Sequence, residues 1–213
     1  MATNITFSCS ACKVIGCNSK DGKYPKQCVS LLLDEKEKAE IIALYNEDEI
    51  NSKIALAAAE IEGLYYGQKT RVEETIEFII RTGAKKVGIA SCAGLLNETS
   101  LFANLLNKYN INYFAVGCKV GATDKSEIGI PGENKLNKGC DHESMCNPIL
   151  QAELLNKQET DINIIIGLCV GHDMLFSKYS KAPVTTMIVK DRVLGHNPVA
   201  ALYASTGAYS RFK

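Results

Sequence analysis

Four of the nine cysteines lie within the first 28 residues, in the pattern Cys9-x2-Cys12-x4-Cys17-x10-Cys28. Four thiolates this close in sequence can surround one tetrahedral zinc ion or hold one cubane iron–sulfur cluster. The pattern matches neither the paired Cys-x2-Cys knuckles of a zinc ribbon nor the bacterial ferredoxin run. We favour a 4Fe-4S cluster, with zinc as the alternative. Unligated thiols that fill a core as small hydrophobes are a third interpretation.

Three further cysteines directly follow apolar segments that are typical of buried strands: Cys92, Cys118 and Cys169. If these strands are parallel neighbours, the three sulfur atoms emerge at the carboxyl edge of the sheet, where open α/β sheets bind ligands. Helix N-termini at that edge favour the thiolate form. We therefore expect a cofactor-binding group, although each cysteine would also suit a tight strand-to-helix turn as a small residue.

A segment without hydrophobic periodicity runs from residue 121 to residue 145. Loops of this length are uncommon inside compact domains and are usually functional. This segment carries Cys140 and His142, and Cys146 follows it directly. If the segment folds over the sheet edge, Cys140 and Cys146 would join the three strand-end cysteines as cofactor ligands.

Thiol catalysis is a further hypothesis, with Cys169 as a nucleophile of low pKa and His172 as its base. It requires the two side chains to lie within hydrogen-bonding reach, which adjacent turn positions do not guarantee. Asp173 completes the candidate catalytic group, but an acidic residue in the first turn of a helix is also favoured by the helix dipole. Lys119, Lys181 and Lys190, near strand ends, would attract an anionic substrate, a weak signal in a chain with many lysines.

The elements that must position these residues alternate along the chain. Apolar strands are expected at residues 87–90, 111–116, 162–168 and 184–189. Helix starts are marked by the Thr70–Glu73 capping box and by Asn147-Pro148. This alternation predicts an α/β fold, doubly wound, with a mainly parallel sheet of four to five strands. Residues 1–33 would form a small cysteine-rich metal-binding region, and residues 34–213 the α/β domain.

The bulk composition excludes several classes of partner. The 24 basic and 24 acidic residues give a formal net charge of zero, which argues against binding to nucleic acid or an anionic membrane. No apolar run reaches transmembrane length and no signal peptide is evident, so we expect a cytoplasmic protein. In a reducing compartment, clustered cysteines are metal ligands or reactive groups rather than disulfides. An apolar helix expected at residues 199–204 would pack in the core or at a homodimer interface.

Four stretches of the chain resemble one family: FSCSACKVIGC, GCDHESMCNPILQAELLN, TDINIIIGLCVGHDMLFSKYSKAPVTT and VKDRVLGHNPVAALY. It is the cysteine-rich, uncharacterised metal-binding family known as domain of unknown function eighteen forty-seven, found mostly in anaerobic bacteria and archaea. The resemblance covers essentially the whole chain. It implies metal binding through the cysteine and histidine positions already named, and an anaerobic setting would suit an oxygen-sensitive cluster. It implies no particular reaction.

Two functional hypotheses follow from these patterns. In the first, the N-terminal group holds an iron–sulfur cluster for electron transfer and the sheet-edge group holds a second centre that acts on a small molecule. The protein would then be a small iron–sulfur-dependent oxidoreductase, with an unidentified substrate or redox partner protein. In the second, the N-terminal group holds structural zinc, and the strand-end thiols bind, deliver or sense a metal without turnover.

Overall fold

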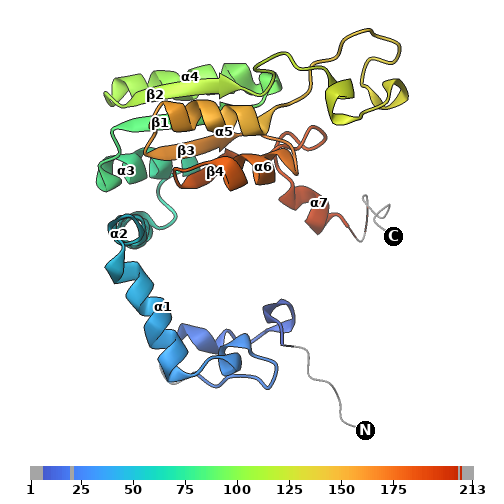
Figure 1. The fold of residues 1–213 in the computed structure, drawn as a ribbon. Helices are drawn as coiled ribbons and strands as arrows, with labels where there is room; N and C mark the ends of the chain where they lie inside the picture. Colours follow the sequence, from blue (N-terminus) through green and yellow to red (C-terminus); the bar gives the residue numbers. More distant parts are fainter. Residues whose placement is uncertain (1–6, 20–21, 206, 208–213) are drawn as a thin grey trace. The chain divides into compact units, whose positions relative to one another are not determined.

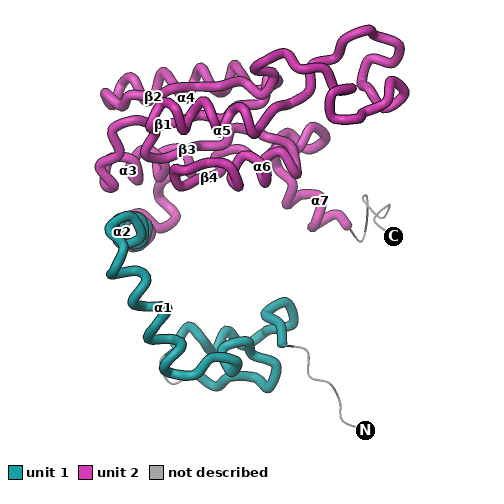
Figure 2. Tube along the Cα trace, in the orientation of Figure 1, with its two compact units in different colours: residues 1–60 teal, residues 61–213 magenta. Residues whose placement is uncertain are grey.

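The computed structural model describes residues 7–19, 22–205 and 207 (Figure 1). The chain divides into two compact units, Met1–Glu60 and Ile61–Lys213 (Figure 2). The boundary expected after residue 33 falls inside the first of these units. Each unit is described separately below.

The first unit contains three short 3-10 helices, η1 (Cys9–Ala11), η2 (Gly16–Asn18) and η3 (Val29–Leu32). They are followed by α1 (Glu35–Glu47) and by α2 (Glu49–Tyr65), which crosses the unit boundary. No side chain of η1, η2, η3 or α1 is buried. This part of the chain therefore has no hydrophobic core of its own.

Helix α1 was not among the helices expected from the sequence. Its start is marked by a capping box in which the Asp34 carboxylate accepts from the Glu37 N–H, 2.8 Å away, and Glu37 accepts from the Asp34 N–H. That is the same local signal that predicts α3. Its first turn also carries Glu35, which the helix dipole favours. The helix was missed because its apolar residues do not form a clear stripe.

The second unit is built on a four-stranded parallel sheet, which confirms the α/β prediction. The strands are β1 (Lys86–Ser91), β2 (Asn112–Gly117), β3 (Ile162–Ile166) and β4 (Val184–Ile188), in the order β2-β1-β3-β4. Every residue of β3 is buried, as is expected for a strand covered on both faces, whereas β2 is an edge strand with exposed residues.

Helices cover both faces of this sheet. Helix α3 (Arg71–Thr82) leads into β1, η4 (Ala93–Leu95) and α4 (Leu96–Lys108) connect β1 to β2, α5 (Pro148–Lys157) precedes β3, and α6 (His172–Tyr179) connects β3 to β4. The chain moves outward from β1 to β2 and then returns across β1 to β3. Because crossovers between parallel strands are right-handed, α4 lies on one face and α5 and α6 lie side by side on the other (Figure 1).

The local signals for these helices are as expected. The Thr70–Glu73 capping box starts α3, and Gly83, with a φ of 70°, ends it. The Asn147 side chain caps α5, with Pro148 in its first turn. The last helix, α7 (Val199–Tyr203), starts after Pro198 and has no buried residue.

The core of the second unit lies between the sheet and these helices. Its fully buried apolar side chains come from β1 and β3 and from the facing sides of the helices; they include Ile79, Val87, Ile89, Leu106, Leu155, Ile164, Ile165, Ile166 and Phe176. Within the described part of the chain, no helix is long and apolar enough to cross a membrane.

Candidate functional site

The strand order places three cysteines in a row at the carboxyl edge of the sheet. Cys118 follows β2, Cys92 follows β1 and Cys169 lies three residues beyond β3. The Cys92 N–H donates to Ile166 O at 3.0 Å, which joins the ends of β1 and β3. The order reverses between β1 and β3, so this edge is the topological switch point where ligands bind in open α/β sheets.

A buried glutamine fixes two of these strand ends. Gln151 of α5 is fully buried, and its Nε2 donates to Ser91 O at 3.1 Å and to Val116 O at 2.7 Å. These carbonyl groups belong to β1 and β2, immediately before the turns that carry Cys92 and Cys118. Gln151 therefore sets the spacing between the two turns. Its side chain did not stand out in the sequence, where it reads as one polar residue in an amphipathic helix.

The long connection after β2 brings a fourth cysteine to the edge. Cys146 stands directly before Asn147, the cap residue of α5, and its Sγ atom lies 3.6 Å from the Sγ atom of Cys118. Cys118 is 2% exposed, whereas Cys146 is half-buried. The Ala93 N–H donates to the Cys118 sulfur at 3.2 Å.

The two thiols differ in their ionisation. The contact between the two sulfur atoms is the largest cause that lowers the pKa of Cys146; desolvation opposes it, and the charges of Lys119 and His172 lower the pKa further. The same hydrogen bond and its deeper burial raise the pKa of Cys118. Cys146 is thus the thiolate of the pair, and Cys118 remains the protonated partner.

The third side of the site is formed by the turn after β4. Arg192 donates to Cys169 Sγ at 2.9 Å. The pKa of Arg192 is raised first by this hydrogen bond and by the charge of Cys169, with smaller contributions from Cys92 and Cys146, so all three thiols act on the guanidinium group electrostatically. Arg192 did not stand out in the sequence, although it follows a strand end just as the cysteines do.

A hydrogen-bonded turn holds Arg192 in place. The Asp191 carboxylate accepts from the Val193 and Leu194 N–H groups at 2.9 Å, and the Asp191 N–H donates to Nδ1 of His196 at 3.1 Å. His196 is in the left-handed region, with a φ of 67°. This histidine therefore shapes the turn.

A lysine completes the positive surroundings. A Cβ atom placed on Gly94 would lie 3.5 Å from Nζ of Lys190 and 3.9 Å from Sγ of Cys92, so the ammonium group and this thiol flank the same glycine. Lys119 lies on the opposite side, next to Cys146. The N-termini of α5 and α6 add partial positive charge. The site therefore favours thiolates and anionic ligands.

The segment between β2 and α5 is organised around one carboxylate. Asp124 accepts from the Ser126 N–H at 2.8 Å, from the Glu143 N–H and from Lys135 Nζ at 3.0 Å, and these contacts hold its pKa well below its usual range. His142 pairs with Asp124 at 3.5 Å and lies 3.0 Å from the Ser144 hydroxyl group. These contacts place His142 in the framework of the loop.

The remaining candidates take different places. Cys140 lies in the outer part of the loop, where its N–H donates to Asn137 O at 3.3 Å. The His172 and Asp173 N–H groups donate to Cys169 O at 2.9 and 3.1 Å, which is the start of α6. The thiol of Cys169 faces Arg192, and the charge of His172 acts on Cys146. The pairing of Cys169 with His172 stays a prediction.

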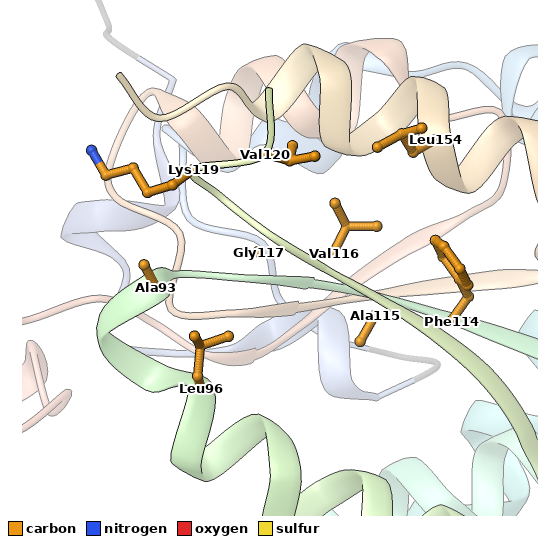
Figure 3. Close-up of a pocket in the computed structure, with 9 residues that line it drawn as sticks. All are labelled: Ala93, Leu96, Phe114, Ala115, Val116, Gly117, Lys119, Val120 and Leu154. Atoms are coloured by element: carbon orange, nitrogen blue, oxygen red, sulfur yellow. The ribbon is translucent and has the colours of Figure 1, made fainter. Parts of the chain in front are cut away.

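A shallow pocket of about 350 Å³ adjoins the thiols along the exposed edge strand β2 (Figure 3). Apolar side chains of β2, α4 and α5 line it, among them Leu96, Phe114 and Leu154. Ala93 and Lys119 lie at one end of the pocket, and both also contact the Cys118–Cys146 pair. The apolar part of a ligand that contacts the thiols would pack against these side chains.

In the first unit, the four cysteines are arranged by short turns. The Cys12 N–H donates to Cys9 O at 3.0 Å, so these two residues share one 3-10 turn. The Val14 and Ile15 N–H groups point at the Cys12 sulfur and lower the pKa of its thiol. Cys17 lies in η2 and Cys28 directly precedes η3. Over residues 7–19, 22–205 and 207, no three or more His, Cys, Asp or Glu side chains are placed to hold a metal ion together.

Comparison with known proteins identifies the family. The family described as protein of unknown function (DUF1847) matches residues 28–187. The chain belongs to the DUF1847 family. It is 49% identical over 187 residues to the uncharacterized protein MJ0455 of Methanocaldococcus jannaschii, a match that covers 88% of this chain and 91% of the archaeal protein. The matched residues of the DUF1847 family include every cysteine of the sheet edge, and Cys28 of the N-terminal group.

Proposed function

We propose that this DUF1847 protein binds metal through Cys9, Cys12, Cys17 and Cys28 and works as a small redox protein. The observation that carries the proposal is the lack of buried side chains among the described residues of the first unit that precede α2, which are residues 7–19 and 22–47. Apolar side chains such as Val14 and Ile15 are exposed there, by 61% and 65%. Segments this small that lack a hydrophobic core usually fold around a metal or disulfides.

The donor set suits a thiolate-bound metal. Four cysteines supply the full coordination of a 4Fe-4S cluster or of structural zinc. The two N–H groups that point at the Cys12 sulfur stabilise its deprotonated form, which is the form that binds metal. The four sulfur atoms do not yet converge in the described residues, and metal-dependent folding accounts for this, since such sites rarely exist before the metal binds.

An iron–sulfur cluster is the first candidate. When bound, it would supply single electrons. The sheet edge would bind the small molecule that exchanges these electrons. Arg192 and Lys119 attract an anionic group, and the apolar pocket beside β2 holds the rest of the molecule. The protein would then be an oxidoreductase that acts on a small molecule at the sheet edge.

Zinc is the second candidate, and one observation favours it. Cys9 and Cys12 share a single tight turn, which is the arrangement that two-residue spacing gives in structural zinc knuckles. In this case the first unit has a structural role, and the thiols of the sheet edge bind or sense a metal without turnover.

The test is anaerobic purification of the full chain, followed by iron, sulfide and zinc analysis with an ultraviolet–visible spectrum. We expect iron with matching sulfide in the wild type. Cys12→Ser should lose most of that metal while the sheet stays folded, since Cys12 lies outside the second unit. Cys140→Ser makes the same chemical change in the outer loop and should keep the metal. Wild-type protein without bound metal, or a Cys12→Ser variant with unchanged metal content, would refute the proposal.

A further inference from the structure

Backbone hydrogen bonds hold Cys118 and Cys146 together at the two ends of the long loop between β2 and α5. The Asn147 N–H donates to Cys118 O at 2.8 Å, and the Met145 N–H donates to Thr123 O, also at 2.8 Å. An antiparallel bridge between Asp124 and Ser144 lies just beyond. Because these contacts close the loop where it leaves the sheet, the 3.6 Å distance between the two sulfur atoms is set by the fold.

The two thiols occupy unequal positions. Cys118 is 2% exposed and receives the Ala93 N–H, so it is held inside the protein. Cys146 is half-buried and precedes α5, whose N-terminus carries partial positive charge. Lys119 lies beside it. An accessible sulfur that attacks and a buried sulfur that resolves are the two components of a thiol–disulfide exchange site.

A metal ion is a poorer explanation of this pair. A metal site takes at least three protein ligands, so a third side chain would have to join these two sulfur atoms. Of the two other edge thiols, Cys169 is held by Arg192, a cation that a metal would have to displace. The pair is therefore best explained by its own chemistry.

We propose that Cys146 and Cys118 form a redox-active dithiol that exchanges with small-molecule disulfides. The proposal does not depend on the metal of the first unit. The surroundings set the ligand class: Lys119 and Arg192 favour disulfides that carry carboxylates, and the apolar pocket beside β2 accepts the remainder of the molecule.

The exchange takes place in two balanced steps. The Cys146 thiolate attacks one sulfur of a disulfide RS–SR, so a bond forms between Cys146 Sγ and that sulfur, and RS⁻ leaves. Cys118 then loses its proton to solvent and attacks Cys146 Sγ, and the second RS⁻ leaves. The protein pair is oxidised by two electrons, and the small disulfide is reduced to two thiols that take up two protons.

The geometry needs little adjustment for the second step. A disulfide bond is about 2 Å long, so the two sulfur atoms must approach by roughly 1.5 Å. Rotation of the half-buried Cys146 side chain can supply most of that movement, while the Gln151 contacts keep the Cys118 turn in place.

The test uses the full chain, reduced and then incubated anaerobically with oxidised glutathione, a disulfide that carries carboxylates. Acid quenching, alkylation and peptide mapping by mass spectrometry then report each cysteine separately. We expect a peptide that links Cys118 to Cys146, with Cys92 and Cys169 recovered mainly as free thiols. Cys118→Ala should instead accumulate glutathione on Cys146, because the resolving thiol is gone.

Two controls keep the test decisive. Cys146→Ser should lose the linked peptide, and Cys169→Ser, a cysteine of the same edge outside the pair, should retain it. Thermal unfolding of each variant checks that the sheet is intact. The wild-type peptide map tests the proposal even if a variant does not fold. Recovery of Cys118 and Cys146 as free thiols, or a dominant link from Cys146 to Cys92 or Cys169, would overturn the proposal. So would a folded Cys118→Ala protein without glutathione on Cys146.

Discussion

The ionisation of Cys146 gives the most direct test of the site. Its pKa is lowered to about 5, first by the hydrogen bond with Cys118 and then by the charges of Lys119 and His172. Arg192 also lies within electrostatic reach. Desolvation raises the pKa and is the second-largest contribution, smaller than the hydrogen bond but larger than the effect of either charge. We therefore predict that Cys146 is alkylated at acidic pH, where ordinary thiols are inert.

The expected magnitude follows from two opposing factors. At about pH 5.5, roughly three-quarters of a thiol with a pKa of about 5 is ionised, against about one in a thousand for an ordinary cysteine with a pKa of about 8.5. A thiolate of lower pKa is intrinsically less nucleophilic, here by about 40-fold at a Brønsted slope near 0.45. The net advantage is about 20-fold at this pH for equal access, and it disappears near pH 7.

The assay is alkylation by iodoacetamide between about pH 4 and 9, with the rate at Cys146 followed by peptide mapping. Because access alters the absolute rate, the midpoint of the pH profile is the quantity to compare. Lys119→Gln should move the midpoint upward, since it removes a neighbouring positive charge. Lys181→Gln, an exposed lysine outside the site, should leave it unchanged. A wild-type midpoint at or above about 8 would refute the electrostatic reasoning.

Three further predictions concern the framework of the site. Gly88→Ala should lower the free energy of unfolding by about 2–3 kcal/mol in urea denaturation, because the new Cβ would lie 1.9 Å from a buried amide oxygen, whereas Gly132→Ala has open space and should be nearly neutral. Gln151→Met should cost about 2 kcal/mol, because two buried carbonyl groups lose their donor, and should slow formation of the proposed disulfide. Asp124→Ala should accelerate amide hydrogen exchange in the long loop, and Asp141→Ala should not. Because the folded protein lowers the pKa of Asp124, the stabilisation of the loop by the ionised carboxylate is present above the unfolded pKa of about 4. It is lost only as the pH falls towards the lower folded pKa, so the loop amides should stay protected from exchange down to about pH 4.

The sequence by itself determined the elements of the second unit. Short apolar runs identify the four strands, and the run of β3 is the clearest because that strand is covered on both faces. Capping residues such as Thr70 and Asn147 identify helix starts, because they satisfy backbone N–H groups that the helix leaves free. These signals are local, so they need no knowledge of the fold. Helix α1 shows the limit of this approach, because its signal is a capping box without a clear apolar stripe.

Only the tertiary structure decided how the functional groups meet. The sequence placed Cys118 and Cys146 in one candidate group of five. The two residues are 28 positions apart, and they meet because backbone hydrogen bonds join the two ends of the intervening loop. Arg192 reaches Cys169 because β4 lies beside β3, and strand order is not encoded in any local pattern. Proximity and pKa depend on distances between distant segments and on the burial that packing creates. Residue types and spacing along the chain determine neither.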